Sequence, residues 1–146
     1  MPSGALHRTV YMSTAVGVLR AEELDRIYLR AQSANAGAGI TGLMLFYEGV
    51  FLQVLEGPHA GVTGLLEKIR RDRRHSNLVV LESGPVAARS FAQSPMHFIA
   101  ARNLSAGEKQ AFSELRQAVA ARTGHALPHL GLADFLAAFA APKPAL

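Results

Sequence analysis

The feature that most restricts the fold is a pair of apolar runs joined by a two-residue turn. Residues 40–47 (ITGLMLFY) and 50–56 (VFLQVLE) are mostly apolar and do not alternate with polar residues. Strands of this kind are covered on both faces of a sheet. Glu48-Gly49 lies between them with glycine in the second position, which is typical of a tight β-hairpin. The pattern therefore predicts a central hairpin with cover on both sides.

Residue periodicity predicts the elements that flank this hairpin. In chain order they are a strand at 8–13, a helix from Ala21 to near Gly37, a helix at roughly 59–71 after Pro58, a strand at 77–87 that ends at Gly84-Pro85, and a fifth strand from Met96. The order βαββαββ predicts an α+β, ferredoxin-like sandwich. We expect a mixed five-stranded sheet with the two crossover helices on one face.

Two further helices are predicted in the C-terminal part. The first opens with a Ser105-x-x-Glu108 capping box, and the second begins near Leu132 and is almost entirely apolar on one face. We expect both helices to cover the other face of the sheet. Residues 1–101 are then the main domain, and residues 102–146 are a helical cap or output extension of the same domain.

Composition narrows the chemistry. The 146 residues carry a formal charge of +4, which would suit a phosphate-bearing ligand or loose contact with nucleic acid. The absence of cysteine excludes disulfides, thiolate metal sites and cysteine nucleophiles. No apolar run reaches membrane-spanning length, and residues 1–8 lack the apolar stretch of a signal peptide. We therefore expect a cytoplasmic protein with no membrane partner.

Three neutral polar residues occur in apolar surroundings: Tyr11, Asn35 and Gln53. A purely structural interpretation pairs the Tyr11 hydroxyl with the Gln53 amide oxygen and makes Asn35 the C-cap of the first helix. One hydroxyl does not satisfy all the donors and acceptors of a primary amide, so another acceptor should lie nearby. Without a charged catalytic pair, the set favours binding of a flat polar heterocycle over acid–base hydrolysis.

Familiar catalytic and metal motifs are absent. The chain has no GxGxxG, P-loop, HExxH or GxSxG sequence, and its six histidines show no metal-ligand spacing. The cluster at 70–75 (RRDRRH) has two interpretations, a solvated helix C-terminus or a phosphate contact. We expect no metal site and no enzymatic activity.

Several segments together resemble the BLUF family, blue-light sensors that use flavin, usually FAD. They are VYMS around Tyr11, SANAGAGITGLMLFY around Asn35, FLQVLEG around Gln53, RRDRRHSNLVVLESGPVAARSF and the strand at Met96. The resemblance covers about residues 7–101 in the right order and spacing. It implies that residues 1–101 are a flavin-binding photosensory domain with FAD as cofactor, FMN and riboflavin being alternatives.

The resemblance also implies roles for individual residues. Tyr11, Gln53 and Met96 match the photochemical tyrosine, the switching glutamine and the methionine of the last strand. The implied flavin-binding residues, besides Gln53, are Asn35 at the ring edge, Ile27 and Ile69 as apolar walls, and Lys68, Asp72, Arg74 and His75 at the ribityl and phosphate part. Blue light would drive an electron and a proton from Tyr11 to the flavin, and the rearranged Gln53 would give a red-shifted state.

The chain departs from the family at two places. Ser94 stands where many members have tryptophan, and Ala34 stands where many have a polar side chain. These differences concern which residue occupies the pocket beside Gln53 and whether one hydrogen bond to the flavin edge is missing.

The output and the alternatives stay open. The implied signal passes through the last strand and the C-terminal helices to a downstream protein, and the apolar final helix is compatible with a homo-oligomer. Alternatives are a light-insensitive flavin-binding module, a ferredoxin-like RNA-binding module and a small hydrolase of acylphosphatase type. Nucleic acid is disfavoured because the strands lack an exposed aromatic platform.

Overall fold

The computed structural model describes residues 5–92, 97–100 and 103–121. Their elements are β1 (Leu6–Ala15), α1 (Ala21–Ala38), β2 (Thr41–Tyr47), β3 (Val50–Pro58), α2 (His59–Arg70), β4 (His75–Val86), β5 (His97–Ala100) and α3 (Ala106–Ala121). The chain divides into two compact units, Met1–Ala100 and Ala101–Leu146. The first unit has the βαββαββ order that the sequence predicts.

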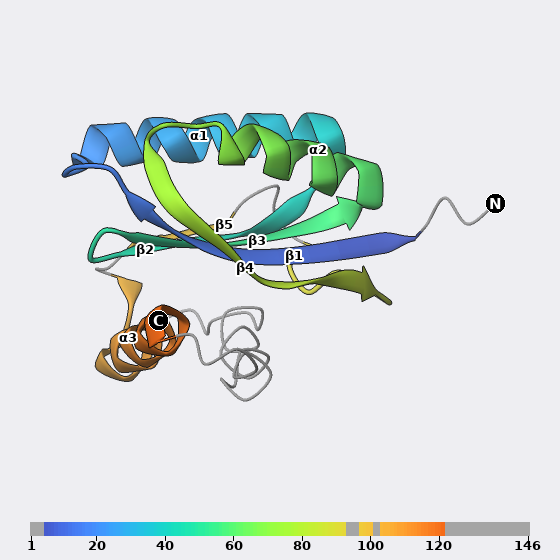
Figure 1. Cartoon of the computed structure of the whole chain (residues 1–146). Coiled ribbons are helices and arrows are strands. Elements are labelled where there is room, and N and C mark those ends of the chain that lie inside the picture. The colour runs from blue at the N-terminus through green and yellow to red at the C-terminus, as the bar shows by residue number, and fades with distance from the viewer. Residues whose placement is uncertain (1–4, 93–96, 101–102, 122–146) are drawn as a thin grey trace, which may run out of the picture. The chain divides into compact units, whose positions relative to one another are not determined.

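Among the described residues, the strands form one sheet in the order β4-β1-β3-β2-β5. The first four are antiparallel neighbours, and the short β5 pairs in parallel with β2 at the edge. Because β3 lies between β1 and β2, α1 crosses over it in the manner of a ferredoxin-like split βαβ unit. Figure 1 shows α1 and α2 on the same face of this sheet, as expected for the crossover helices.

The central hairpin forms as predicted. Glu48 and Gly49 have φ angles of 50° and 79°, which are the left-handed values that a type I′ turn requires. Gly42 in β2 is needed for a different reason, since a Cβ at this position would overlap the carbonyl oxygen of Val54 in β3. The ITG sequence therefore lets the two strands of the hairpin approach each other.

Both faces of the hairpin are buried, in agreement with its unbroken apolar pattern. On the helix-facing side, Tyr11, Phe51 and Leu55 belong to a core cluster against which the apolar stripes of α1 and α2 pack. Leu52 and Val54 point to the opposite face by strand alternation, and both are fully buried. Gln53 therefore faces the helical layer.

Two local predictions are wrong. Asn35 is not a C-cap, because α1 continues past it and is capped by Gly39 with a φ of 72°. The fourth strand begins at His75 and does not end at Gly84-Pro85, because β4 continues to Val86. As the edge strand beside β1, β4 can contain a proline without losing an inward ladder bond.

The second unit contains α3, and its capping box is confirmed. The backbone N–H of Glu108 donates to Ser105 Oγ at 3.1 Å, and that of Ser105 donates to Glu108 Oε1 at 2.8 Å. The helix expected from Leu132 lies outside the described residues, so three helices are described where four were expected. Cover of the second sheet face by the C-terminal helices stays a prediction. No described helix is long and apolar enough to cross a membrane.

Candidate functional site

A cavity of about 390 Å³ opens between the helical layer and the sheet. This volume lies within the range of roughly 300–1,000 Å³ that is common for small-molecule sites. The cavity brings together every predicted site residue within the described part of the chain: Tyr11, Ile27, Asn35, Gln53, Lys68, Ile69, Asp72, Arg74 and His75. Met96 lies outside the described residues.

Tyr11 and Gln53 form the polar centre of the cavity wall. They are direct partners across the β1–β3 ladder, so their side chains leave the sheet on the same face. The Tyr11 hydroxyl donates a hydrogen bond to Gln53 Oε1, which confirms the predicted pairing. Both residues are almost fully buried. Gln53 accepts this bond through its oxygen, and a primary amide also carries N–H donors of the kind that suit a carbonyl or ring-nitrogen acceptor.

The surroundings of Tyr11 keep its proton in place. Burial raises the pKa of the Tyr11 phenol well above its usual range, and the negative charge of Asp72 raises it further. A raised pKa means that the phenol stays protonated and neutral at physiological pH. Tyr11 is thus a hydrogen-bond donor in the resting protein.

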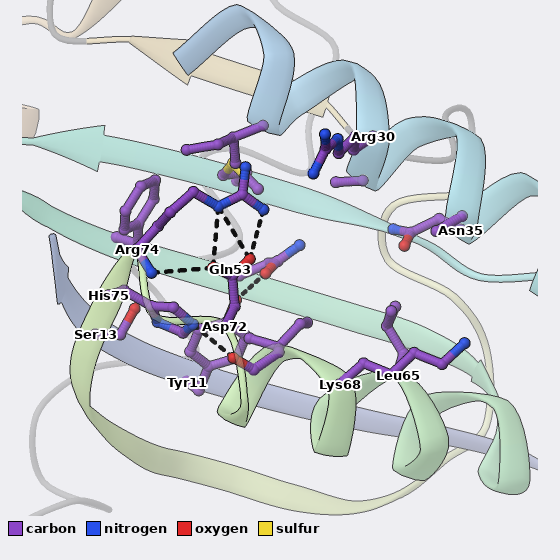
Figure 2. Close-up of a pocket in the computed structure, with 16 residues that line it drawn as sticks. Tyr11, Ser13, Arg30, Asn35, Gln53, Leu65, Lys68, Asp72, Arg74 and His75 are labelled. Atoms are coloured by element: carbon purple, nitrogen blue, oxygen red, sulfur yellow. Dashed lines mark hydrogen bonds and ion pairs between the residues drawn. The ribbon is translucent and has the colours of Figure 1, made fainter. Parts of the chain in front are cut away.

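Asp72 and Arg74 form an ion pair at the end of the cavity near β4 (Figure 2). Arg74 Nε donates to Asp72 Oδ1 at 2.9 Å, and the backbone N–H of Arg74 donates to the same oxygen at 3.0 Å. The hydrogen bond from Arg74 lowers the pKa of the Asp72 carboxyl to about 2. The pair gives this end a fixed arrangement of charge.

A backbone carbonyl group orients the His75 ring. Its Nε2 lies 2.6 Å from the carbonyl oxygen of Ile69. Because a carbonyl only accepts, Nε2 carries the proton that is donated. The His75 ring centroid is 6.4 Å from that of Tyr11 and 6.4 Å from that of Phe51. This bond leaves Nδ1 as the His75 atom that can serve a ligand.

Asn35 and Lys68 lie farther along the cavity from the Tyr11 end (Figure 2). Asn35 is fully buried on α1, whereas Lys68 is exposed on α2. The buried Asn35 amide and the exposed Lys68 ammonium suit a ligand with a polar ring edge and an anionic or hydroxylated tail. Of the other basic residues at 70–75, Arg70, Arg71 and Arg73 are exposed and do not line this cavity.

Sequence reasoning missed several residues that line the cavity. The additional ones are Ser13, Arg30, Ala31, Met44, Phe51 and Leu65. Strand alternation could have found Ser13 and Phe51, since they lie two residues from Tyr11 and Gln53 respectively. Helical spacing could have found Leu65, which lies four residues before Ile69. A pattern search that extends each known site residue along its own face would have recovered most of the wall.

The wall fits the chemistry of a flavin. Apolar side chains from both helices, including Ile27 and Ile69, can enclose a flat ring, and Gln53 and Asn35 can bond its polar edge. Ser13 Oγ is buried and has no hydrogen-bond partner among the described residues. A buried hydroxyl without a partner is costly, so a ligand with polar atoms would satisfy a need that the wall leaves open. The described residues hold no cluster of three or more potential metal ligands.

Comparisons with known proteins give the same identification. The sequence profile of BLUF, "Sensors of blue-light using FAD", matches residues 6–97. A photoactivated adenylate cyclase subunit alpha of Euglena gracilis is 35% identical over 98 residues, which are 67% of this chain and 10% of that protein. The chain thus spans about a tenth of the length of this curated relative.

Solved structures agree with the sequence relatives. A bacterial light-regulated adenylyl cyclase is 33% identical with a TM-score of 0.70, over 79% of this chain and 34% of that one. The photo-activated state of BlsA has a TM-score of 0.76 over 97% of this chain and 99% of that one, and its 22% identity supports the fold alone. These matches do not favour an RNA-binding module. The chain belongs to the BLUF family, the flavin-binding sensors of blue light.

Proposed function

We propose that this chain senses blue light through Tyr11 and Gln53, with a flavin held in the cavity between the helices and the sheet. The observation that carries this proposal is the Tyr11–Gln53 hydrogen bond inside the cavity wall. Tyr11 carries a firmly held proton, and Gln53 can accept it at one end of its amide and donate at the other.

We assign the remaining cavity residues to binding. Ile27 and Ile69 would enclose the ring, and Asn35 would bond its edge. The ribityl and phosphate part would lie toward Lys68, Asp72, Arg74 and His75. Arg74 already donates to Asp72, so it would bind the ligand while it remains paired with that carboxylate. FAD is the flavin we favour because the family is described by it, with FMN and riboflavin as alternatives.

A bound oxidised flavin absorbs blue light and, once excited, can take an electron from a nearby donor. Tyr11 would supply the electron, and its hydroxyl proton would leave along the bond to Gln53 Oε1. When electron and proton have returned, Gln53 would remain rotated, tautomerised or both, with new hydrogen bonds. Rearranged bonds at the chromophore edge give a small red shift that reverses thermally in the dark.

We infer that the chain itself catalyses no reaction and passes its state to another protein in the cytoplasm. The relatives that match it are named as adenylate cyclases, and the chain corresponds to about 10% of one and 34% of the other. Met96, β5 and the extension at 102–146 would carry the output. A homo-oligomer formed through the apolar C-terminal segment is a further part of this proposal.

The test is an absorption spectrum before and after blue light. The purified protein loaded with FAD should be yellow and should shift reversibly to the red. Gln53→Leu should keep the flavin and lose the shift, and Tyr11→Phe should lose the normal photocycle. Arg73→Gln, at an exposed residue outside the cavity, is the matched control and should shift as the unmodified protein does.

Two results would contradict the proposal in different ways. A colourless protein that takes up no added FAD would exclude the flavin site. A yellow protein whose spectrum does not change under blue light would indicate a flavin-binding module without photochemistry.

A further inference from the structure

The second polar residue of the FLQVLEG sequence lies on the other side of the sheet. Glu56 follows Gln53 by three positions in β3, so strand alternation directs it away from the cavity. It is fully buried, although carboxylates are seldom found completely inside a protein unless they are paired. Nothing in the photochemistry proposed for Tyr11 and Gln53 uses this group.

The Glu56 side chain holds the connection between β4 and β5. The backbone N–H groups of Ser90 and Phe91 each donate to Glu56 Oε1 at 2.9 Å. The guanidinium of Arg8 in β1 donates through Nε to Oε2 at 2.9 Å. The carboxylate thus binds its own neighbouring strand and a segment that lies 34 and 35 positions farther along the chain.

Arg89 adds a second attachment at the same place. Its guanidinium donates to the backbone oxygen of Glu56 at 3.0 Å and to the Thr41 hydroxyl in β2 at 2.9 Å. It also donates to the Gly39 carbonyl at 2.8 Å. Residues 89–91 are therefore tied to Glu56 through both its main chain and its side chain, and we call these contacts the Glu56 clamp.

Hydrogen bonds are directional, so these contacts hold residues 89–91 at a defined position relative to Glu56. Well-packed apolar side chains often stabilise a buried corner as well as an ion pair does, so stability alone does not call for a carboxylate here. Two backbone N–H groups on one carboxylate oxygen make the segment at 90–91 follow any movement of the Glu56 side chain. The clamp therefore links the strand that carries Gln53 to the segment that leads toward β5.

We propose that Glu56 is a positioning residue that couples the Gln53 strand to residues 89–91, so that the state of Gln53 alters the clamp and the clamp alters the return of Gln53 to its dark arrangement. The inference rests on the proposed function of Gln53. Coupling between two sites acts in both directions, so a clamp that responds to Gln53 must also influence Gln53.

The first measurement uses the unmodified protein loaded with FAD. Amide hydrogen exchange at Ser90 and Phe91 is compared in the dark and under continuous blue light. We expect light to change exchange at both amides by at least about twofold, the lower limit of what a coupling residue contributes. Ala15, whose N–H donates to the Gly49 carbonyl at 2.8 Å beyond the other end of the ladder, should change less.

The second measurement compares two charge-removing variants. Glu56→Gln keeps the size of the side chain but removes its charge and turns an N–H₂ group toward donors. Glu82→Gln removes another carboxylate that faces Arg8, at 3.9 Å, but touches neither Ser90 nor Phe91. We expect Glu56→Gln to change the dark-reversion rate of the red-shifted state by at least about twofold, and Glu82→Gln to leave it unchanged.

The outcomes separate the two proposals. A normal red shift with unchanged exchange at Ser90 and Phe91, or with equal reversion rates in all three proteins, would overturn the role of Glu56 and leave the proposed function standing. An unmodified protein that shows no red shift would overturn both. Should Glu56→Gln fail to fold, the exchange measurement on the unmodified protein decides alone.

Discussion

Gln53 and Glu56 are three residues apart in one strand, yet their surroundings differ in kind. Gln53 lines a cavity and accepts a hydrogen bond from the neutral side chain of Tyr11. Glu56 is enclosed on the opposite face by N–H donors from Arg8, Ser90 and Phe91. A carboxylate accepts only, so this arrangement admits a single pattern of bonds.

The amide of Gln53 has the opposite property. Its oxygen and nitrogen ends are nearly equal in size, so two orientations fill the same space and differ only in which end donates. A switch needs two arrangements of similar energy, and an anchor needs one that is much better than any other. The strand thus combines a residue suited to switching with a residue suited to holding, and strand alternation keeps them on separate faces.

The largest expected effect is on the anchor. Glu56→Ala removes the acceptor of Arg8 Nε and of two backbone N–H groups, so we expect a loss of about 3–5 kcal/mol in the free energy of unfolding. Urea denaturation of the flavin-free protein measures this. Glu82→Ala, on the exposed side of Arg8, should change stability by no more than about 0.5 kcal/mol. Equal effects of the two substitutions would show that Glu56 is not an anchor.

A smaller loss of stability is expected on the face of β3 that carries Gln53. Tyr11→Phe removes the donor to Gln53 Oε1 inside the cavity wall, and we expect a loss of about 1–3 kcal/mol. The same denaturation experiment applies. Tyr28→Phe, which removes a part-buried hydroxyl that accepts from Gln32 at 3.0 Å, is the matched control for a lost hydroxyl. A cost at Tyr11 as large as that at Glu56 would remove the proposed difference between the two faces.

The contribution of the Asp72–Arg74 ion pair to stability should depend on pH in the acid range. The pKa of the Asp72 carboxyl is about 2 in the folded protein against an ordinary value of 3.8, so its stabilising contribution is complete above about pH 4 and is lost as the pH falls toward 2. Since Asp72 is partly exposed, the contribution should be about 0.2–1 kcal/mol. Stability measured from pH 5 to 2 should fall less steeply in Asp72→Asn. An unchanged slope would mean that the pair with Arg74 does not form in solution.

The smallest effect is expected at Ser13. Its buried hydroxyl has no partner among the described residues, so Ser13→Ala should leave the flavin-free protein equally stable or stabilise it by up to about 1 kcal/mol. If a bound flavin satisfies this hydroxyl, the same substitution should weaken FAD binding, as measured by fluorescence titration. A clear destabilisation of the flavin-free protein would indicate that Ser13 has a structural role instead.

Much of the fold could be predicted because its signals are local. The Glu48-Gly49 turn, the apolar stripes of α1 and α2 and the capping box at Ser105 each depend on residues within about four positions of one another. The resemblance then supplied the predicted residues that line the cavity. Ser13 lies two residues from Tyr11 on the same face of β1, so alternation along this strand would also predict it as a cavity residue.

The tertiary structure decided which distant residues become the hydrogen-bond partners of Gln53 and Glu56. The sequence alone determined that FLQVLEG is a buried strand with two polar residues, but it did not determine their partners. Strand order places Tyr11 opposite Gln53, and the path of the chain after β4 brings Ser90 and Phe91 to Glu56. A buried polar group must be satisfied, yet any donor that the fold delivers can satisfy it, so its partner is set by topology rather than by neighbouring residues.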